Sequence, residues 1–341
     1  MERMILDTID LNILSTLARD CRTSYNSIGS QIGLTSKSVK ARVKNMLRSG
    51  VIEKFVVRVN PAAFGYRTAI VLVRANIGMT KDDVIQRVKK FGELAYHVHH
   101  MGRTSVAALI IKSPLDNNIS QSLNDRLKPA TVISVAFSEL SVSMDIGETD
   151  LRVIKCLLLS GARTEISDIA KEVSISEKTT TRRLDRMKEA RLMDFSIQCS
   201  PAAMIGRIQF VIPIVVAKSH YRSVLERMYS EFQSYILYRP SVISPEDQLT
   251  FVLFGENVFT VDSIISRVTS FEGVKNADAY ILTKWQYYDD WIIKEIDKRL
   301  FPRTLPHNQH MWSTRCMLQV TGHPTLRLTV FRHNVKAFSL H

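Results

Sequence analysis

The sequence has few cysteines and no long apolar run. Its 341 residues contain no Cys-x-x-Cys pair, and the four cysteines lie far apart at Cys21, Cys156, Cys199 and Cys316. This excludes a disulfide framework and is typical of free thiols in a reducing compartment. No stretch reaches the roughly 18 apolar residues of a membrane span, and no apolar run follows a basic start as in a signal peptide. We therefore expect a cytoplasmic protein with no membrane partner.

Enzyme signatures and acidic residues are also scarce. The chain has no Gly-x-x-x-x-Gly-Lys phosphate loop, no His-Glu-x-x-His and no Gly-x-Ser-x-Gly. Asp and Glu number 33 against 46 Lys and Arg, which gives a net charge of +13. Such an excess favours a polyanionic partner such as DNA, although ribosome-associated and membrane-surface proteins share it. We predict a binding protein with no catalytic residue, metal or cofactor.

What the sequence does contain is an internal repeat with a period of about 140 residues. The run from Asp10 to Leu14 aligns with the run from Asp150 to Ile154, and Pro61-Ala62-Ala63 recurs as Pro201-Ala202-Ala203. Between these points the offset drifts by a single residue. A period of this length indicates a duplicated pair of domains rather than a solenoid.

Each copy begins with three short helices. In the first copy, apolar residues at helical spacing follow Asp10, the expected N-cap, and a second helix ends at Gly33. Thr35 caps a third helix, which Gly50 ends and whose buried face is Val39, Val43 and Met46. Residues 51–59 then predict a strand pair, closed by a proline. This order predicts a winged helix-turn-helix with a β-hairpin wing.

The rest of each copy alternates strands and helices in the order β-α-β-β-α-β, which predicts a ferredoxin-like domain. In the first copy we expect strands at 68–75, 95–100, 106–112 and 132–143 and helices at 81–91 and 120–126. In the second we expect strands at 210–217, 235–239, 249–254 and 277–284 and helices at 221–232, 261–271 and 292–300. The predicted class is α+β, with winged helix-turn-helix domains at 1–62 and 147–202, ferredoxin-like domains at 63–146 and 203–302, and a tail at 303–341.

The third helix of each copy is the expected recognition helix. The first copy holds seven basic residues and one acid between 35 and 58, and a basic helix with serines near its N-terminus suits a major groove and its phosphates. The predicted DNA-binding residues there are Ser36, Lys37, Ser38, Lys40, Arg42, Lys44 and Arg48, with Lys54 and Arg58 on the wing. Those of the second copy are Lys178, Thr179, Thr181, Arg182, Arg183 and Arg186. Because Asp185 and Glu189 share that second stripe, we expect weaker binding there; an ordinary solvated helix is the alternative in both copies.

The first copy resembles a known family of regulators. The run from Asp10 to Leu14, the segment from Leu34 to Val43 and the closing Gly50-Val51-Ile52 resemble the Lrp/AsnC (feast/famine) regulators of bacteria and archaea. The resemblance implies a sequence-specific regulator of double-stranded DNA, whose ferredoxin-like domains pair by their sheets and bind an amino acid or similar effector. In the family, the effector site includes the turn after the second ferredoxin-like strand. Here that turn contains Gly102, Arg103 and Thr104, which keeps the glycine and lacks the acid of amino-acid sensors.

The duplication leaves the assembly open. The two copies can pair within one chain as a pseudo-dimer, or chains can join as a homo-oligomer. Because the two recognition helices differ, a single chain should prefer an asymmetric DNA site.

Two other functions remain compatible with the residues. Sirohaem decarboxylases resemble this architecture, and the cluster His97, His99 and His100 beside Arg103 could serve a tetrapyrrole. Strand alternation would place His97 and His99 on one face and His100 on the other, where the alternative is a polar face at an interface. An interaction adaptor with partly vestigial DNA-binding folds is the third hypothesis.

The tail differs in composition from the repeats. Residues 303–341 lack Asp and Glu and hold five of the nine histidines. A basic segment that touches DNA phosphates is the favoured interpretation. The other hypotheses are a zinc site from His307, His310, Cys316 and His323, and a strand at 326–331.

Overall fold

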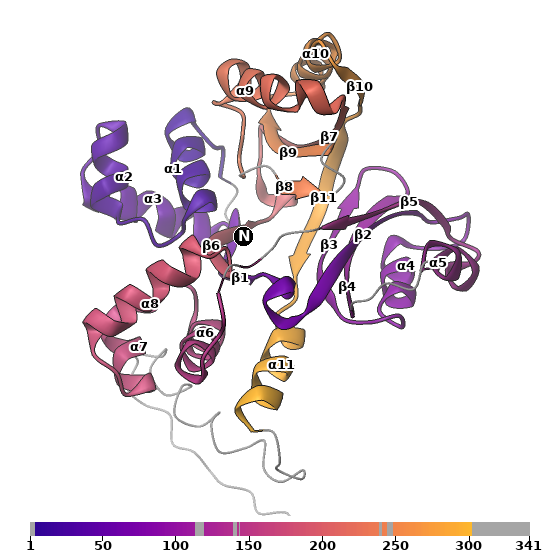
Figure 1. Ribbon diagram of the computed structural model, residues 1–341. Helices are drawn as coiled ribbons and strands as arrows, with labels where there is room; N and C mark the ends of the chain where they lie inside the picture. The colour runs from indigo at the N-terminus through magenta and orange to yellow at the C-terminus, as the bar shows by residue number, and fades with distance from the viewer. Residues whose placement is uncertain are drawn as a thin grey trace, which may run out of the picture. The chain divides into compact units, whose positions relative to one another are not determined.

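The computed structural model describes residues 4–112, 119–138, 142, 144–238, 241–243 and 248–301 (Figure 1). The predictions for the tail, namely the phosphate-binding segment, the zinc site and the strand at 326–331, lie outside the described residues. None of the helices in the described residues is long and apolar enough to cross a membrane.

Three helices open the first copy: α1 (Thr8–Arg19), α2 (Tyr25–Ile32) and α3 (Ser36–Arg48). The predicted start of α1 is wrong by one turn. The N-cap is Asp7, whose side chain accepts a hydrogen bond from the Asp10 backbone, while the Asp10 carboxylate accepts one from the Asp7 backbone. Asp10 therefore closes a reciprocal capping box from inside the helix.

The local signals at the other two helices are confirmed. Gly33 ends α2 in the left-handed conformation at φ 73°, and the Thr35 hydroxyl accepts the backbone N–H of Ser38 at the start of α3. The inward face of α3 is, as predicted, Val39, Val43 and Met46.

The second copy repeats these elements as α6 (Glu148–Ser160), α7 (Ile166–Val173) and α8 (Glu177–Glu189). Ser176 caps α8 as Thr35 caps α3, with its hydroxyl accepting the backbone N–H of Thr179. The two copies thus start their third helices with the same local chemistry.

The wings differ from the prediction. Instead of a hairpin in each copy, each copy supplies a single strand, β1 (Ile52–Val59) and β6 (Met193–Cys199), and these two strands pair antiparallel as a separate sheet. Val56 lies opposite Ser196 in this register. A lone strand would leave its backbone groups unpaired, so each copy satisfies the other.

Hydrogen bonds between the two copies surround this sheet. Arg22 donates to the carbonyls of Ala162 and Thr164 at 2.8 and 2.9 Å, and Arg163 donates to the carbonyls of Cys21 and Thr23. Each arginine thereby binds the turn that contains the other. The helix-turn-helix modules are paired inside one chain, which is the pseudo-dimer among the predicted arrangements.

The first ferredoxin-like domain has the predicted element order. Its elements are β2 (Tyr66–Arg74), α4 (Lys81–Val88), β3 (Leu94–His100), β4 (Thr104–Lys112), α5 (Ile119–Leu127) and β5 (Thr131–Ser138). The strand order is β5-β2-β4-β3, and α4 and α5 cover one face of this sheet (Figure 1).

The second ferredoxin-like domain follows the same plan with two corrections. Its elements are β7 (Ile208–Val216), α9 (Tyr221–Phe232), β8 (Ser241–Ile243), β9 (Gln248–Gly255), α10 (Val258–Thr269), β10 (Val274–Ala277) and β11 (Tyr280–Tyr287). The predicted strand at 235–239 is replaced by an isolated bridge from Ile236 to Leu253, and β8 is the second strand. The predicted strand at 277–284 divides into β10 and β11, which both pair with β7. Short 3-10 turns lie at Pro61–Phe64, Pro201–Ala203 and Lys218–His220.

One strand joins the two ferredoxin-like domains. β11 pairs with β3 of the first domain as well as with β7, so the strands of both domains form one hydrogen-bonded sheet in the order β5-β2-β4-β3-β11-β7-β9-β8. The chain then continues into α11 (Asp290–Leu300), where Trp291 is buried edge-on against Phe64 and Tyr66. Trp291, in the first turn of α11, is therefore part of the core. Burial also raises the pKa of the Cys21 and Cys199 thiols to about 12, as expected for inert structural cysteines.

The pairing of the two copies generates a stability prediction. Changing Arg22 or Arg163 to Gln leaves turn carbonyls of the opposite copy without their charged donor, and each substitution should lower the free energy of unfolding by about 1–3 kcal/mol. Urea denaturation of the full chain measures this.

The matched control is Arg222→Gln, because Arg222 forms an exposed helical ion pair with Glu226 of a kind worth about 0.3–0.5 kcal/mol. Equal midpoints for the control and the two turn variants would show that the reciprocal arginines do not stabilise the pairing.

Candidate nucleic-acid interface

The exposed face of α3 is a stripe of cations. Ser36, Lys37, Ser38, Lys40, Lys44 and Arg48 are all exposed, as predicted, while the opposite face packs into the core. The helix holds five basic residues and no acidic one. Within the described part of the chain, no ion pair involves Lys37, Lys40 or Lys44. Their charges therefore face solvent without a compensating carboxylate.

Arg42 lies elsewhere. Its guanidinium contacts the carboxylates of Asp7 and Asp10 at 2.8 Å each, and Asp10 is buried. The hydrogen bond to Asp10 raises the pKa of Arg42. Arg42 was predicted to contact DNA. In the structure it instead forms ion pairs that link α3 to the start of α1.

The exposed face of α8 carries charges of both signs. Lys178, Thr181 and Arg182 are exposed as predicted, and a shallow hollow on this face is lined by Lys178, Thr181, Arg182, Asp185, Arg186 and Glu189. The helix holds five basic residues and three acidic ones. Its surface potential is therefore weaker than that of α3.

The remaining predicted residues of α8 hold the module together. Arg183 and Arg186 contact the two oxygens of buried Asp150 at 2.7 and 3.0 Å. Thr179 is half-buried and hydrogen-bonded to the Ser176 hydroxyl at 2.9 Å. Asp150 and Asp10 are equivalent positions of the repeat, so the shared Asp and Arg residues are structural in both copies.

The two wing cations are engaged inside the chain. Arg58 on β1 makes two hydrogen bonds, of 2.6 and 3.0 Å, with Asp194 on β6, and Lys54 lies 3.4 Å from Asp289. Burial alone would lower the pKa of Arg58, but Asp194 and Tyr287 raise it above its usual value. The prediction placed these residues on the DNA backbone. In the structure Arg58 links the two wing strands, and Lys54 links β1 to the start of α11.

The predicted effector residues form the turn between β3 and β4. Gly102 adopts φ 80°, the Arg103 side chain is exposed, and Thr104 bonds to His100 at 3.2 Å. The turn lies beside the junction of the two ferredoxin-like domains. The backbone N–H of Met101 donates to the carbonyl of Ile281 on β11, and the next residue of β11, Leu282, pairs with His100 on β3.

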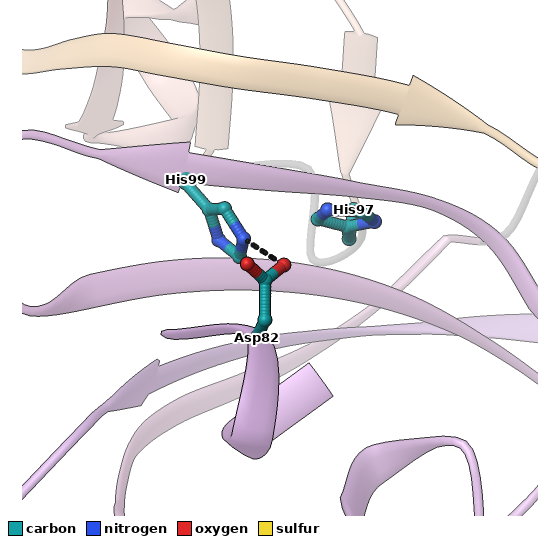
Figure 2. A group of neighbouring side chains, drawn as sticks. All are labelled: Asp82, His97 and His99. Atoms are coloured by element: carbon teal, nitrogen blue, oxygen red, sulfur yellow. Dashed lines mark hydrogen bonds and ion pairs between the residues drawn. The ribbon is translucent and has the colours of Figure 1, made fainter. Parts of the chain in front are cut away.

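The histidine cluster follows the predicted alternation. His97 and His99 share one face of β3 with ring centroids 4.7 Å apart, while His100 lies on the other face against Tyr280. All three are buried. Figure 2 shows the carboxylate of Asp82, from the first turn of α4, facing His97 and His99. Asp82 was not predicted, since it precedes His97 by 15 residues and no local motif connects the two.

The protonation of this cluster follows from burial. Burial lowers the pKa of His97 and of His100 to about 4, and it also lowers the pKa of His99. Hydrogen bonds from His99 and Lys284 lower the pKa of Asp82 to about 2. At neutral pH the imidazoles are therefore neutral and the carboxylate is ionised.

Known proteins resemble both copies. The winged helix-turn-helix DNA-binding model HTH_24 matches residues 6–53 and 147–192. An HTH-type transcriptional regulator of Pyrococcus horikoshii is 38% identical over 90 residues, which are 26% of this chain and 56% of that protein. The HTH-type transcriptional regulator LrpA of the same organism is 36% identical over 62 residues, 18% of this chain and 44% of that protein. The chain thus spans about half the length of these curated relatives.

Two solved structures are similar to this chain at low identity. The siroheme decarboxylase NirDL has a TM-score of 0.46 at 11% identity, over 87% of this chain and 99% of that chain. AsnC of Escherichia coli has a TM-score of 0.31 at 17% identity, over 41% of this chain and 94% of that chain.

The buried Asp10 generates a prediction that separates structure from recognition. Arg42→Gln leaves Asp10 buried without its cation, so the free energy of unfolding should fall by about 3 kcal/mol. Lys44→Gln, two residues further along α3 on the exposed stripe, should change it by less than about 0.5 kcal/mol. Urea denaturation compares the two, and an Arg42 variant as stable as the Lys44 variant would contradict the structural role.

Proposed function

We propose that this chain, whose two winged helix-turn-helix modules are of the Lrp/AsnC type, is a transcription regulator that binds double-stranded DNA mainly through α3. The observation that carries the proposal is the exposed face of α3, where three lysines have no carboxylate partner within the described residues. A helix surface of this kind has no stabilising role in the fold, whereas it complements the phosphates that flank a major groove.

The N-terminal half of α3 is the part that reads bases. Ser36, Lys37 and Ser38 lie in its first turn and are exposed, where recognition helices meet base edges and the helix dipole attracts phosphate. Lys40 and Lys44 follow at one-turn spacing along the same surface and bind the backbone on either side of the groove. Arg42 contributes by orientation, since its link to Asp7 and Asp10 fixes α3 against α1.

The α8 module is the weaker half of an asymmetric site. Asp185 and Glu189 stand among its exposed cations and repel phosphate, while Lys178, Thr181 and Arg182 remain available near the N-terminus. Because the two modules are paired within one chain, a single molecule presents one strong and one weak recognition helix. The preferred DNA site is then two unlike half-sites rather than a palindrome.

The turn of Gly102, Arg103 and Thr104 is the proposed effector position. It lies beside the junction of β3 with β11, so a ligand there touches residues that link the two ferredoxin-like domains. The exposed guanidinium of Arg103 favours a carboxylate-bearing effector such as an amino acid.

Charge reversal on α3 tests the DNA proposal. The triple variant Lys37→Glu, Lys40→Glu and Lys44→Glu should lose any selected motif at about 150 mM salt, and its affinity should fall by at least about 100-fold. The measurement is selection from random DNA fragments followed by titration of the recovered sequence. The matched control reverses Lys90, Lys218 and Lys275, which are equally exposed on the ferredoxin-like domains and should retain the motif.

If the control loses affinity as much as the α3 variant, binding reflects net charge alone. If the wild-type chain recovers no motif, the regulator proposal fails and tetrapyrrole absorbance titrations become the next test.

The asymmetry between the modules is tested separately. Reversing Lys178 and Arg182 to Glu should cost about tenfold in affinity, clearly less than reversing Lys37 and Lys44, because α8 already carries two exposed acids. The selected motif should lose one half-site and keep the other. Equal losses for the two pairs, or a motif with exact two-fold symmetry, would contradict the ranking.

A further inference from the structure

Two histidines and a carboxylate converge on the helix-covered side of the first ferredoxin-like sheet. His97 and His99 project from the same face of β3, and Asp82 reaches them from the first turn of α4 (Figure 2). One ligand atom from each of the three residues lies within 4.8 Å of the others. The two rings are buried, whereas Asp82 is 67% exposed in its side chain, which leaves a path from solvent.

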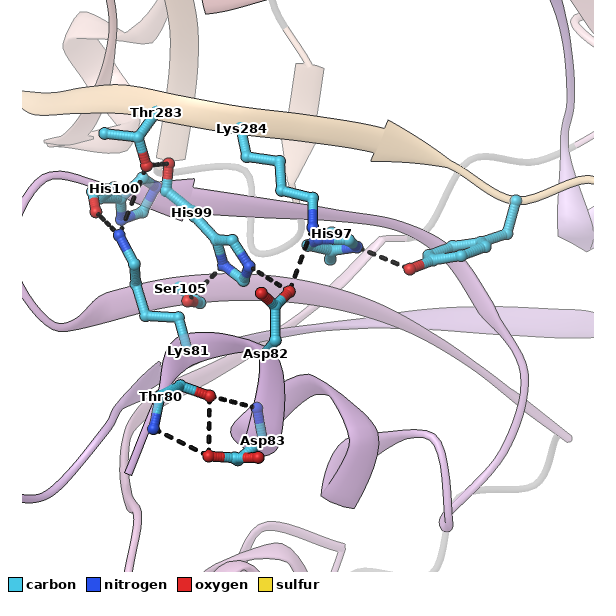
Figure 3. A network of polar contacts seen from close by, with 11 residues as sticks. Thr80, Lys81, Asp82, Asp83, His97, His99, His100, Ser105, Thr283 and Lys284 are labelled. Atoms are coloured by element: carbon cyan, nitrogen blue, oxygen red, sulfur yellow. Dashed lines mark hydrogen bonds and ion pairs between the residues drawn. The ribbon is translucent and has the colours of Figure 1, made fainter. Parts of the chain in front are cut away.

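Hydrogen bonds orient both rings. His99 Nδ1 bonds to the Ser105 hydroxyl and His97 Nδ1 bonds to the Tyr288 hydroxyl, each at 2.8 Å (Figure 3). His97 therefore keeps Nε2 for another partner, whereas Nε2 of His99 is hydrogen-bonded to Asp82 Oδ1 at 3.1 Å and would exchange this bond for the ion. Metal-binding histidines are held in the same way, with the second ring nitrogen fixed by a polar neighbour.

Among the described residues, no hydrogen-bond donor or acceptor reaches His97 Nε2. The atom is buried, and the residue as a whole is 1% exposed. A buried polar atom without a partner costs about 1–3 kcal/mol. An ion between His97, His99 and Asp82 would satisfy this atom.

We propose that Asp82, His97 and His99 bind a divalent transition-metal ion such as Zn²⁺ or Co²⁺, through Nε2 of both imidazoles and one carboxylate oxygen. Two nitrogen ligands favour such borderline ions over Mg²⁺ and Ca²⁺, which prefer oxygen. A tetrahedral ion with bonds of about 2.1 Å separates its ligand atoms by about 3.4 Å. His99 Nε2 and Asp82 Oδ1 already lie 3.1 Å apart, and no pair of ligand atoms, at 4.8 Å or less, has to close in by more than about 1.4 Å. The remaining position is open to water.

Lys284 competes with the ion. Its ammonium group lies 3.1 Å from Asp82 Oδ1, the same carboxylate that the metal requires (Figure 3). The lysine comes from β11 of the second ferredoxin-like domain and is half-exposed, so it can leave for solvent. Binding of the ion therefore exchanges a contact between the two domains for a ligand bond within the first.

This competition gives two variants with opposite effects. Asp82→Asn and Lys284→Gln both remove the Asp82–Lys284 ion pair, but the first removes a ligand and the second removes the competing cation. Asp82→Asn should weaken metal binding at least about tenfold, and Lys284→Gln should strengthen it by a comparable factor. Loss of the ion pair as such cannot produce both results.

The experiment titrates the chelator-treated full chain with Co²⁺ and follows its visible absorption, then displaces Co²⁺ with Zn²⁺. The wild-type chain should show a saturable spectrum typical of tetrahedral or five-coordinate Co²⁺. The His97→Gln and Asp82→Asn variants should each bind one equivalent of Co²⁺ less. His220→Gln is the control, because His220 is a surface histidine beside Glu272, and it should keep that equivalent. Histidines elsewhere bind equally in all these variants and cancel in the comparison.

A spectrum and affinity unchanged in both Asp82→Asn and His97→Gln would overturn the proposal, as would a Lys284→Gln chain that binds less tightly than wild type. Asp82 is exposed, so its variant should fold, and circular dichroism checks this. DNA affinity of the metal-free chain is measured in parallel. If the chain binds the metal but not DNA, only the regulator proposal fails. If it binds DNA but not the metal, only the metal proposal fails.

Discussion

The antiparallel pairing of β1 with β6 is the contact on which the arrangement of both DNA-binding modules depends. Neither strand has a hairpin partner in its own copy, so each completes its backbone hydrogen bonds only across the repeat. The reciprocal bonds of Arg22 and Arg163 lie beside this sheet and tie the modules by the turns after their first helices. A chain with a single copy would have to find this partner in a second molecule, whereas duplication supplies it at fixed stoichiometry.

The same interaction explains why the wing cations do not behave as the sequence indicates. Arg58 has the charge and position of a phosphate contact, but the partner strand brings Asp194 directly opposite. Arg42 and Arg183 are similar: each lies on a helix whose exposed face is rich in cations, and each contacts a buried aspartate. Charge counts cannot separate these arginines from the exposed lysines, because the separation depends on which carboxylates the fold buries nearby.

Signals contained within a few residues predicted the fold well. Gly33 and Thr35 set helix boundaries through their own backbone conformation and side-chain bond, and the alternation of His97, His99 and His100 followed from strand geometry alone. The largest error arose where distant residues decide, because each wing strand pairs with the other copy and not within a hairpin of its own. The strand expected at 235–239 forms only an isolated bridge from Ile236 to Leu253, while residues 241–243 pair along β9. The start of α1 was predicted three residues too late, because two aspartates share the cap: the Asp7 side chain accepts the Asp10 backbone N–H, and Asp10 closes the capping box from inside the helix.

The histidine cluster illustrates a further limit, since its chemistry is assembled from three parts of the chain. β3 supplies the rings, α4 supplies Asp82, and β11 supplies Lys284 and leads to Tyr288. β11 continues toward α11, where Asp297 lies 2.5 Å from Lys155. Lys155 lies on α6, the first helix of the second DNA-binding module. A ligand affects a distant site only through a contact that differs between its bound and free states. In the metal site that we propose, the Asp82–Lys284 ion pair is such a contact, and the strand that carries it leads to the module that we propose to bind DNA more weakly.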